Sequence, residues 1–551
     1  MMLQGSARGS WRMRGAVLAL LLALALQCVL AMRQKSPTCD EFAHHLANGY
    51  SYLVTHDFRM NPASPPLSRM VPALPLFWMG AKLPTDSSAW DAGDTIAFAK
   101  AFFYRSNGDC VNRYVFWSRV PVVVLSVLFG SVVFWFGSIL LGALGGIFTL
   151  FFYVFSPNIL AHSQLATADL MVAFFFFLSF VGLWFYIRRP EPARLMFLAA
   201  AIGGAFLSKF SALILPPILF LILVTAGQLK LLKPGRVAAL VAVSLLTVWA
   251  GYFFEVKPLL EHTPDPAKKE AMYRKIGGAP LVEFARKTPL PLATFSSGIV
   301  SMMTTRAKGT NAFFMGHWSR EGWWQYYLTA IAIKETLPLI LLTIAGLLWI
   351  RRFAWDRLTV ALVCVPIAAF FVLTFRDKAQ AGIRYFLPVF PLFMLLAAGA
   401  ALWLWRRKHP AAKIAVAALL AWHAASALMI FPDHLTYFNE LVGGPANGYK
   451  YLRDSNLDWC QDLKGVGAWT VQQGYREVAL LQYGIEDPAY YGIPSRSLNP
   501  DEFQKPRATV YAIGLHQIDS LAWTLKVKPA HIVGRSFYIY DFRGGVPADL
   551  T

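Results

Sequence analysis

The stretch Cys39-Asp40-Glu41-Phe42-Ala43-His44-His45 decides how this chain is interpreted. It follows closely on an apolar run at 15–32 and opens the first long polar loop of a mostly apolar chain. Two adjacent carboxylates are costly to keep at a membrane boundary unless they have a function. The stretch therefore predicts a membrane protein with a candidate site just outside its first span.

Composition favours the same fold class. Of the 551 residues, 56% are hydrophobic and 15% are charged, and the mean hydropathy is +0.46. Soluble domains carry about 25% charged residues. The net charge of +20 does not indicate nucleic-acid binding, because the basic residues fall in short clusters between apolar runs, as orientation signals do.

About eleven apolar runs have, or nearly have, the ~20 residues with which a helix spans a bilayer. A cleaved signal peptide is the alternative for the first run, and both interpretations leave Asp40 outside. The runs lie at 15–32, 115–137, 139–156, 170–187, 195–208, 210–227, 237–254, 326–350, 358–375, 383–405 and 411–431.

Basic residues cluster in the short loops at alternate ends of these runs, which the positive-inside tendency places in the cytoplasm. These clusters lie at 188–194, 230–236, 351–357 and 406–413. The opposite side then holds the first external loop (33–114), the short polar patch at 162–169, the second external loop (255–322) and the C-terminal tail. In the first loop, helical spacing of Phe42, Leu46, Tyr50 and Leu53 predicts an amphipathic helix lying along the membrane.

The chain changes character after the predicted transmembrane domain, 1–431. A helix at 457–472 and short strands at 478–481, 508–513 and 532–540 predict an α/β domain outside the membrane, 432–551.

Three aspartates in this tail, Asp454, Asp458 and Asp462, are spaced four apart and would share one helical face. A solvated acidic face is the favoured interpretation, and recognition of an acceptor above the membrane is the alternative.

Two cysteines bracket the first external loop. Cys39 and Cys110 would form a disulfide if that loop faces an oxidising compartment, although spacing alone does not establish a pairing.

The adjacent carboxylates Asp40 and Glu41 are candidates for a catalytic base. Neighbouring side chains on a helix diverge by about 100°, so both cannot address one atom. Asp40 is the predicted catalytic residue, and Glu41 is expected to support it. The alternative is that Asp40 caps the loop helix.

An ordered set of motifs follows this pair. It comprises Asp169, Phe206-Leu207-Ser208-Lys209-Phe210, Glu321-Gly322-Trp323-Trp324-Gln325-Tyr326-Tyr327, Lys334-Glu335-Thr336-Leu337-Pro338 and Gly382-Ile383-Arg384-Tyr385-Phe386-Leu387-Pro388. In order and topological place, the set resembles the GT-C membrane glycosyltransferases, most closely the superfamily of protein O-mannosyltransferases and aminoarabinose transferases. The resemblance covers most of residues 16–431.

The resemblance implies a polytopic α-helical enzyme that transfers a hexosyl or pentosyl group from a polyprenyl-phosphate donor, with inversion, to a protein, lipid or glycan acceptor. It implies a site on the non-cytoplasmic face, in a bacterial inner membrane. A transporter or lipid flippase is the alternative class. Transporters usually carry ionisable groups near the bilayer midplane, whereas here they fall at span ends.

The resemblance also assigns residues. It implies that Asp40 deprotonates the acceptor and that Tyr385 contacts the donor phosphate. Lys209 and Arg384 would bind that phosphate by charge, with interfacial snorkelling as the alternative for Arg384.

Asp169 resembles a second acidic residue that in some relatives helps hold a metal, with an N-cap as its alternative. A divalent metal is therefore an open expectation, with His162 as a further ligand.

Relatives often carry His or Lys just before Pro65-Pro66, where this chain has Ser64. Either Arg59 or Arg69 is expected to supply the missing charge, with a differently bound donor headgroup as the alternative. Arg306 and His317 in the second external loop are further candidates.

Overall fold

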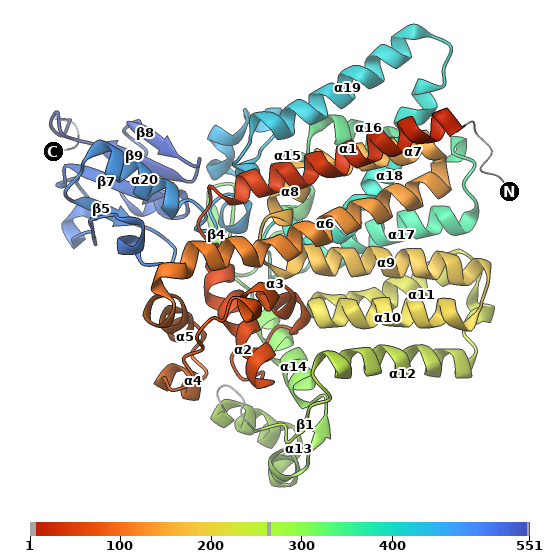
Figure 1. Cartoon of the computed structure of the whole chain (residues 1–551), viewed down its shortest axis with the longest axis horizontal. Coiled ribbons are helices and arrows are strands. Elements are labelled where there is room, and N and C mark those ends of the chain that lie inside the picture. The colour runs from red at the N-terminus through yellow and green to blue at the C-terminus, as the bar shows by residue number, and fades with distance from the viewer. Residues whose placement is uncertain (1–6, 262–265, 548–549, 551) are drawn as a thin grey trace.

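The computed structural model describes residues 7–261, 266–547 and 550. Figure 1 shows long helices lying side by side, with the first external loop, the second external loop and a strand-containing C-terminal domain gathered at one end. In this described part of the chain, seven helices are long and apolar enough to cross a membrane by themselves. They are α1 (Ala7–Met32), α6 (Val111–Leu141), α9 (Ala168–Arg188), α12 (Pro234–Gly251), α17 (Arg357–Thr374), α18 (Phe390–Trp405, with the turn before it) and α19 (Pro410–Met429).

Two further spans are broken. Helices α7 (Ala143–Val154) and α8 (Pro157–Ser163) meet at a bend of 65°, and α15 (Tyr326–Lys334) and α16 (Leu337–Leu348) meet at a bend of 117°. Proline accounts for the new start after each break, since it suits the first turn of a helix and cannot continue one.

Two shorter apolar helices, α10 (Pro192–Ser208) and α11 (Leu215–Thr225), complete the helical region. Every predicted apolar run thus corresponds to a helix or a bent helix pair. The polytopic helical fold is confirmed, and the predicted number of spans is reached only if these two short helices are included.

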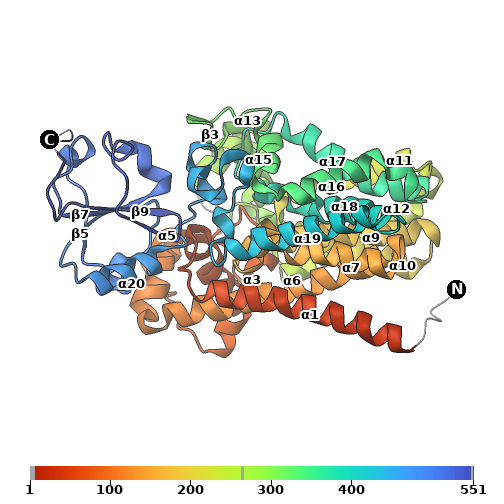
Figure 2. The ribbon, with the colours of Figure 1, turned by 90° about the horizontal axis from the view of Figure 1, so that it is seen from above.

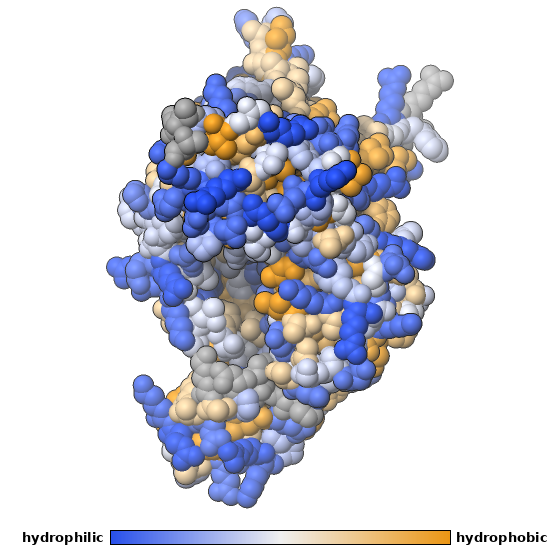
Figure 3. Space-filling model, turned by 90° about the vertical axis from the view of Figure 1, so that its left-hand side faces the viewer, coloured by the Kyte–Doolittle hydropathy of each residue, from blue (hydrophilic) through white to orange (hydrophobic). Residues whose placement is uncertain are grey.

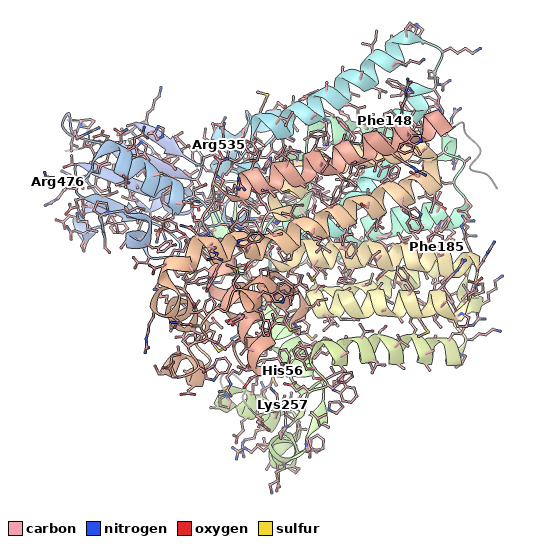
Figure 4. All side chains as sticks on the ribbon, in the orientation of Figure 1. His56, Phe148, Phe185, Lys257, Arg476 and Arg535 are labelled. Atoms are coloured by element: carbon pink, nitrogen blue, oxygen red, sulfur yellow. A yellow bond between two sulfur atoms is a disulfide. The ribbon has the colours of Figure 1, made fainter. Side chains whose placement is uncertain are left out.

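The two ends of the helical region differ. Phe148 and Phe185 lie toward the end remote from the C-terminal domain, whereas His56 and Lys257 lie near the external loops (Figure 4). Arg188 ends α9 at the remote end, so the short basic loops and the long polar loops lie at opposite ends of the helices, as predicted.

The start of the first external loop is packed inside the protein. A π-helical turn, Glu41–Leu46, leads into α2 (Ala47–Thr55), and most residues of both are buried. Helix α2 packs so closely on α3 (Leu67–Trp78) that a Cβ on Gly49 would lie 2.2 Å from the carbonyl oxygen of Arg69. The segment predicted to lie along the membrane is thus buried by protein over residues 47–52, and Val54 near its end is exposed. The short helices α4 (Ser88–Ala92) and α5 (Thr95–Lys100) complete this loop.

The described residues of the second external loop form two helices, α13 (Pro266–Lys287) and α14 (Ala293–Lys308). A short antiparallel pair, β1 (Val256–Lys257) and β2 (Leu290–Pro291), lies on either side of α13 in sequence, and β3 (Ala312–Phe314) and β4 (His317–Ser319) form a hairpin.

The C-terminal domain is a five-stranded sheet with α20 (Leu463–Gln473) beside it (Figure 2). The strand order is β6-β5-β7-β9-β8, with β5 parallel to β6 and β7, and β9 antiparallel to β7 and β8. The strands are β5 (Val478–Leu481), β6 (Ser495–Arg496), β7 (Val510–Gly514), β8 (His531–Val533) and β9 (Phe537–Asp541).

The helix of this domain starts later than predicted. Asp454 has a positive φ of 57° and begins a short 3-10 turn, and α20 begins only at Leu463. Asp454, Asp458 and Asp462 therefore do not share a helical face, and the predicted solvated acidic face is wrong: Asp458 and Asp462 are buried.

The predicted Cys39–Cys110 disulfide is also wrong. Cys39 is bonded to Cys460, with Cα atoms 5.7 Å apart and a sequence separation of 421, and Cys110 is a free thiol. This bond ties the start of the first external loop to the C-terminal domain.

Candidate active site

Four charged side chains from distant parts of the chain form a continuous row. Arg384 places Nη1 3.3 Å from Oδ2 of Asp40 and 3.4 Å from Oδ2 of Asp169. The other oxygen of Asp169 accepts a hydrogen bond of 2.6 Å from Nζ of Lys209. We call Asp40, Arg384, Asp169 and Lys209 the charged row.

Each member of the charged row lies where a helix begins or ends. Asp169 is in the first turn of α9, and Lys209 directly follows α10. Arg384 lies in the 3-10 turn Ile383–Val389 before α18, and Asp40 precedes the π-helical turn. Because these ends meet at one level of the bundle, the row lies at the end that carries the external loops. Neither aspartate makes a side-chain capping bond, so the capping alternatives do not account for them.

The surroundings of Asp40 keep it charged. Burial opposes ionisation, but the nearby Arg384 guanidinium and, to a smaller extent, His45 and His44 hold the pKa of this carboxyl below its usual range. Its side chain is 31% exposed, and Arg384 is its one ion-pair partner among the residues described. Asp40 is therefore an ionised carboxylate with room for another hydrogen-bond partner.

Glu41, the adjacent carboxylate, has no such room. Its side chain is 0% exposed, and Arg119 donates to both its oxygens, from Nε at 2.8 Å and from Nη2 at 2.7 Å. The backbone N–H groups of Thr38 and Ala166 donate the remaining bonds. This saturation suits the expected supporting role and leaves no oxygen for a substrate.

A cavity of about 310 Å³ adjoins the charged row. Four cations line it, Lys209, Arg306, Arg376 and Arg384, against two carboxylates, Asp169 and Asp377. The rest of the lining is largely apolar and comes from α9, α17 and the turns beside them. The cavity thus combines an excess of positive charge with an apolar wall.

Aromatic and charged groups meet on one side of this cavity. Tyr385 lines it, and Nζ of Lys209 lies 4.3 Å from the centre of its ring. Arg306 pairs with Asp377 at 2.6 Å, whereas Arg376 is exposed and has no ion pair among the residues described. Sequence reasoning did not single out Arg376, and its only signal was its place in a polar turn between two spans.

A second cavity, also of about 310 Å³, lies between α10, α11, α12 and α14. Its lining is apolar apart from Ser244. Leu213 lines this cavity and Ile214 lines the first, so the two cavities flank the 3-10 turn Phe210–Ile214 that follows Lys209.

Trp459 covers the charged row from the C-terminal domain. The guanidinium carbon of Arg384 lies 4.2 Å from the centre of its ring, and its carbonyl accepts a hydrogen bond from the N–H of Cys39. The neighbouring Cys460 forms the disulfide to Cys39. No local pattern predicted a contact for Trp459, although it lies within the acidic stretch 454–462.

Two predicted site residues, Arg59 and His317, do not line the cavity beside the charged row. Arg59 pairs with Asp57 at 2.7 Å, lies over the ring of Trp90 and does not line the cavity. His317 is exposed on β4 and is likewise absent from the lining. The missing charge before Pro65 is thus not supplied by Arg59.

The side chains considered as metal ligands, Asp169 and His162, do not belong to a metal-binding set among the described residues. No three His, Cys, Asp or Glu side chains lie together as metal ligands within residues 7–261, 266–547 and 550. Asp40 and Asp169 both face Arg384, and His162 is buried with neither ring nitrogen hydrogen-bonded to a described residue. We derive no chemical step through a metal.

Known proteins provide an independent comparison. Residues 112–252 match the family model of dolichyl-phosphate-mannose-protein mannosyltransferase. This match confirms the resemblance predicted from the ordered motifs, and it includes Asp169 and Lys209. No match was found among curated protein sequences.

Two solved structures are similar over most of this chain. ArnT from Cupriavidus metallidurans bound to undecaprenyl phosphate is 13% identical, with a TM-score of 0.48, over 97% of this chain and 98% of that one. The oligosaccharyltransferase AglB from Archaeoglobus fulgidus, in complex with an inhibitory peptide and a dolichol-phosphate, is 11% identical, with a TM-score of 0.46, over 97% of this chain and 75% of that one.

Proposed function

We propose that this protein is a membrane glycosyltransferase that uses a polyprenyl-phosphate-linked sugar on the non-cytoplasmic face. The observation that carries the proposal is an ionised, partly exposed carboxylate, Asp40, in contact with Arg384, which lines a cavity with excess positive charge and an apolar wall. A phosphate on a hydrocarbon chain requires both features of that cavity. The partial family match over residues 112–252 supports the same class.

The donor phosphate would bind among Lys209, Arg306 and Arg376. Cations at this position stabilise the negative charge that grows on a departing phosphate. The polyprenyl chain would lie along an apolar wall, either in the first cavity or in the adjoining apolar cavity beyond the turn Phe210–Ile214.

Asp40 would accept the proton of the acceptor hydroxyl or amine as that group attacks the anomeric carbon. The bond from the anomeric carbon to the phosphate oxygen breaks as the new bond forms, and polyprenyl phosphate leaves. Attack from the face opposite the phosphate inverts the configuration. Arg384 would hold Asp40 ionised and oriented.

A transporter or flippase would share one feature with this fold, the two bent helix pairs, because transporters often have discontinuous helices. Transporters place ionisable groups near the bilayer midplane. The members of the charged row instead lie at helix ends beside the external loops.

The test is sugar transfer from a panel of synthetic polyprenyl-phospho-sugars by purified wild type and Asp40→Asn. A general base contributes about 10²- to 10⁴-fold, so we expect a rate loss of that size. Binding of polyprenyl phosphate should be retained, because the proposed phosphate site does not include Asp40. Undiminished transfer by the variant would remove Asp40 from the mechanism, and lipid scrambling without transfer by wild type would favour the flippase.

A further inference from the structure

Three rings form an exposed platform where the C-terminal domain meets the second external loop. Tyr483 and His516 have ring centres 4.1 Å apart, and His516 and Trp318 have ring centres 5.1 Å apart. Tyr483 is 47% exposed and Trp318 is 36% exposed. We call Tyr483, His516 and Trp318 the aromatic platform.

The platform lies at the carboxyl ends of two parallel strands. Tyr483 follows β5 by two residues, and His516 follows β7 by two residues. Ligands of open α/β sheets bind outside the carboxyl ends of parallel strands. Trp318 comes from β4, which lies next to the C-terminal domain (Figure 1). The end of the molecule that carries this domain is largely hydrophilic and is hollowed below it (Figure 3).

The platform is held to the charged row by direct contacts. The carboxylate of Asp458 accepts hydrogen bonds from the N–H groups of His516 and Cys460. Between them lies Trp459, whose ring faces Arg384 at 4.2 Å, and Cys460 is bonded to Cys39, the neighbour of Asp40. The platform and the charged row are therefore joined through the short segment 458–460.

The polar groups between the platform and Asp40 favour an uncharged ligand. Asp454 and Asp458 form no ion pair with any cation of the described chain. Burial raises the pKa of Asp458 to about 7 and that of Asp454 to about 6, and the charge of Asp40 adds to the rise at Asp454. Asp454 is a hydrogen-bonding partner for a hydroxyl, whereas Asp458 is buried and already bonded to His516 and Cys460. The ionised Asp40 disfavours an anion at this place.

We propose that the aromatic platform and Asp454 bind the acceptor, and that this acceptor is an uncharged saccharide. The inference rests on the proposed function. The C–H face of a sugar ring would pack on Tyr483 or Trp318, while its hydroxyls bond to Asp454. One free hydroxyl would reach Asp40, which takes its proton as the oxygen bonds to the anomeric carbon of the donor and the phosphate departs.

A peptide acceptor is less well suited to this surface. Peptides that add to a sheet need an exposed strand edge. Both strands that carry the platform are internal, because β5 is paired with β6 and β7, and β7 with β5 and β9.

The experiment measures saccharide binding and transfer separately. Saturation-transfer NMR on the full chain in nanodiscs would test neutral mono- and disaccharides, glucuronic acid as the anionic counterpart, and a serine- and threonine-containing peptide. The variants are Tyr483→Ala, Trp318→Ala and Asp454→Asn. Trp469→Ala is the matched control, because Trp469 also stacks on a histidine, His531, elsewhere in the same domain.

We expect wild type and the control to bind neutral saccharides, and each platform variant to weaken that binding about fivefold or more. With a working donor, the same variants should raise the acceptor KM and leave polyprenyl-phosphate affinity unchanged. Retained saccharide binding in the variants, or binding of the peptide or glucuronic acid alone, would overturn the inference. If wild type neither binds the donor nor transfers sugar, the proposed function is refuted. The NMR result would still decide whether the platform binds saccharide.

Discussion

Two charged regions lie on either side of the single peptide bond between Asp40 and Glu41, and they are built in opposite ways. The sealed region holds Glu41 with Arg119, both 0% exposed and bonded throughout. The open region is the charged row, where Asp40 keeps 31% of its side chain exposed and makes one long contact with Arg384. A carboxylate thus stabilises the fold in the sealed region, whereas a carboxylate in the open region is available for reaction.

The sealed region also includes a second group of buried charges, centred on Lys35. Lys35 is buried between Asp433 and Asp462, and it connects the end of the first span to the C-terminal domain. Buried charges are tolerated when each is paired and hydrogen-bonded, and they are costly when one partner is lost. This difference between the regions predicts that substitutions in the sealed region act on stability and substitutions in the open region act on transfer.

The largest stability effect is expected for Glu41→Gln, which leaves the buried Arg119 guanidinium without its counter-ion. Breaking a buried pair in this way costs about 3–5 kcal/mol. Thermal unfolding in detergent should show a clear loss of stability for Glu41→Gln and little change for Asp40→Asn, its adjacent control. Equal stability of the two variants would mean that the two regions do not differ as described.

The disulfide gives the next largest effect. Cys39→Ser and Cys460→Ser should each lower stability by about 2–4 kcal/mol, and each should reduce transfer, because Trp459 and the first external loop would no longer be held together. Cys110→Ser is the control and should change neither property, since Cys110 is a free thiol. Non-reducing peptide mapping identifies the bond directly, and a Cys39–Cys110 peptide would contradict the structure.

This error in the sequence-based prediction has a physical cause. Helical spans were predictable because each is a local run of apolar residues, and α6, α9 and α17 lie where such runs were found. The partner of Cys39 is 421 residues away, and no local sequence pattern identifies a partner at that distance.

The candidate site was likewise predictable only in part. Asp40, Asp169, Lys209 and Arg384 could be proposed because motif order brought them to one topological side, and the structure brings them within contact. Local patterns failed for the acidic stretch 454–462, because a positive φ at Asp454 and the disulfide at Cys460 replace the expected helix with an irregular segment.

A smaller effect is expected for the unpaired cation of the open region. Arg376→Gln should weaken binding of polyprenyl phosphate about tenfold, the value of one charge-assisted contact of about 1.4 kcal/mol. Arg476→Gln, on the C-terminal domain (Figure 4), is a matched control at a distance from the cavity. Isothermal titration in detergent would measure both affinities, and equal affinities would exclude Arg376 from the phosphate site.

The smallest expected effect is a displacement of the pH profile. The pKa of Asp40 is lowered chiefly by Arg384 against the opposing effect of burial, and His44, His45 and Asp454 are the other titratable groups that act on it. A base with a lowered pKa is active above that pKa, and its activity falls as the pH drops through it. Arg384→Gln removes the main stabilising cation, so the acid limb of the transfer rate should move to higher pH, whatever the change in maximal rate. Arg376→Gln should leave the limb in place, because Arg376 does not contact Asp40. An acid limb that stays unchanged in Arg384→Gln would show that Asp40 is not the group that titrates. Another residue of the open region would then have to be the base.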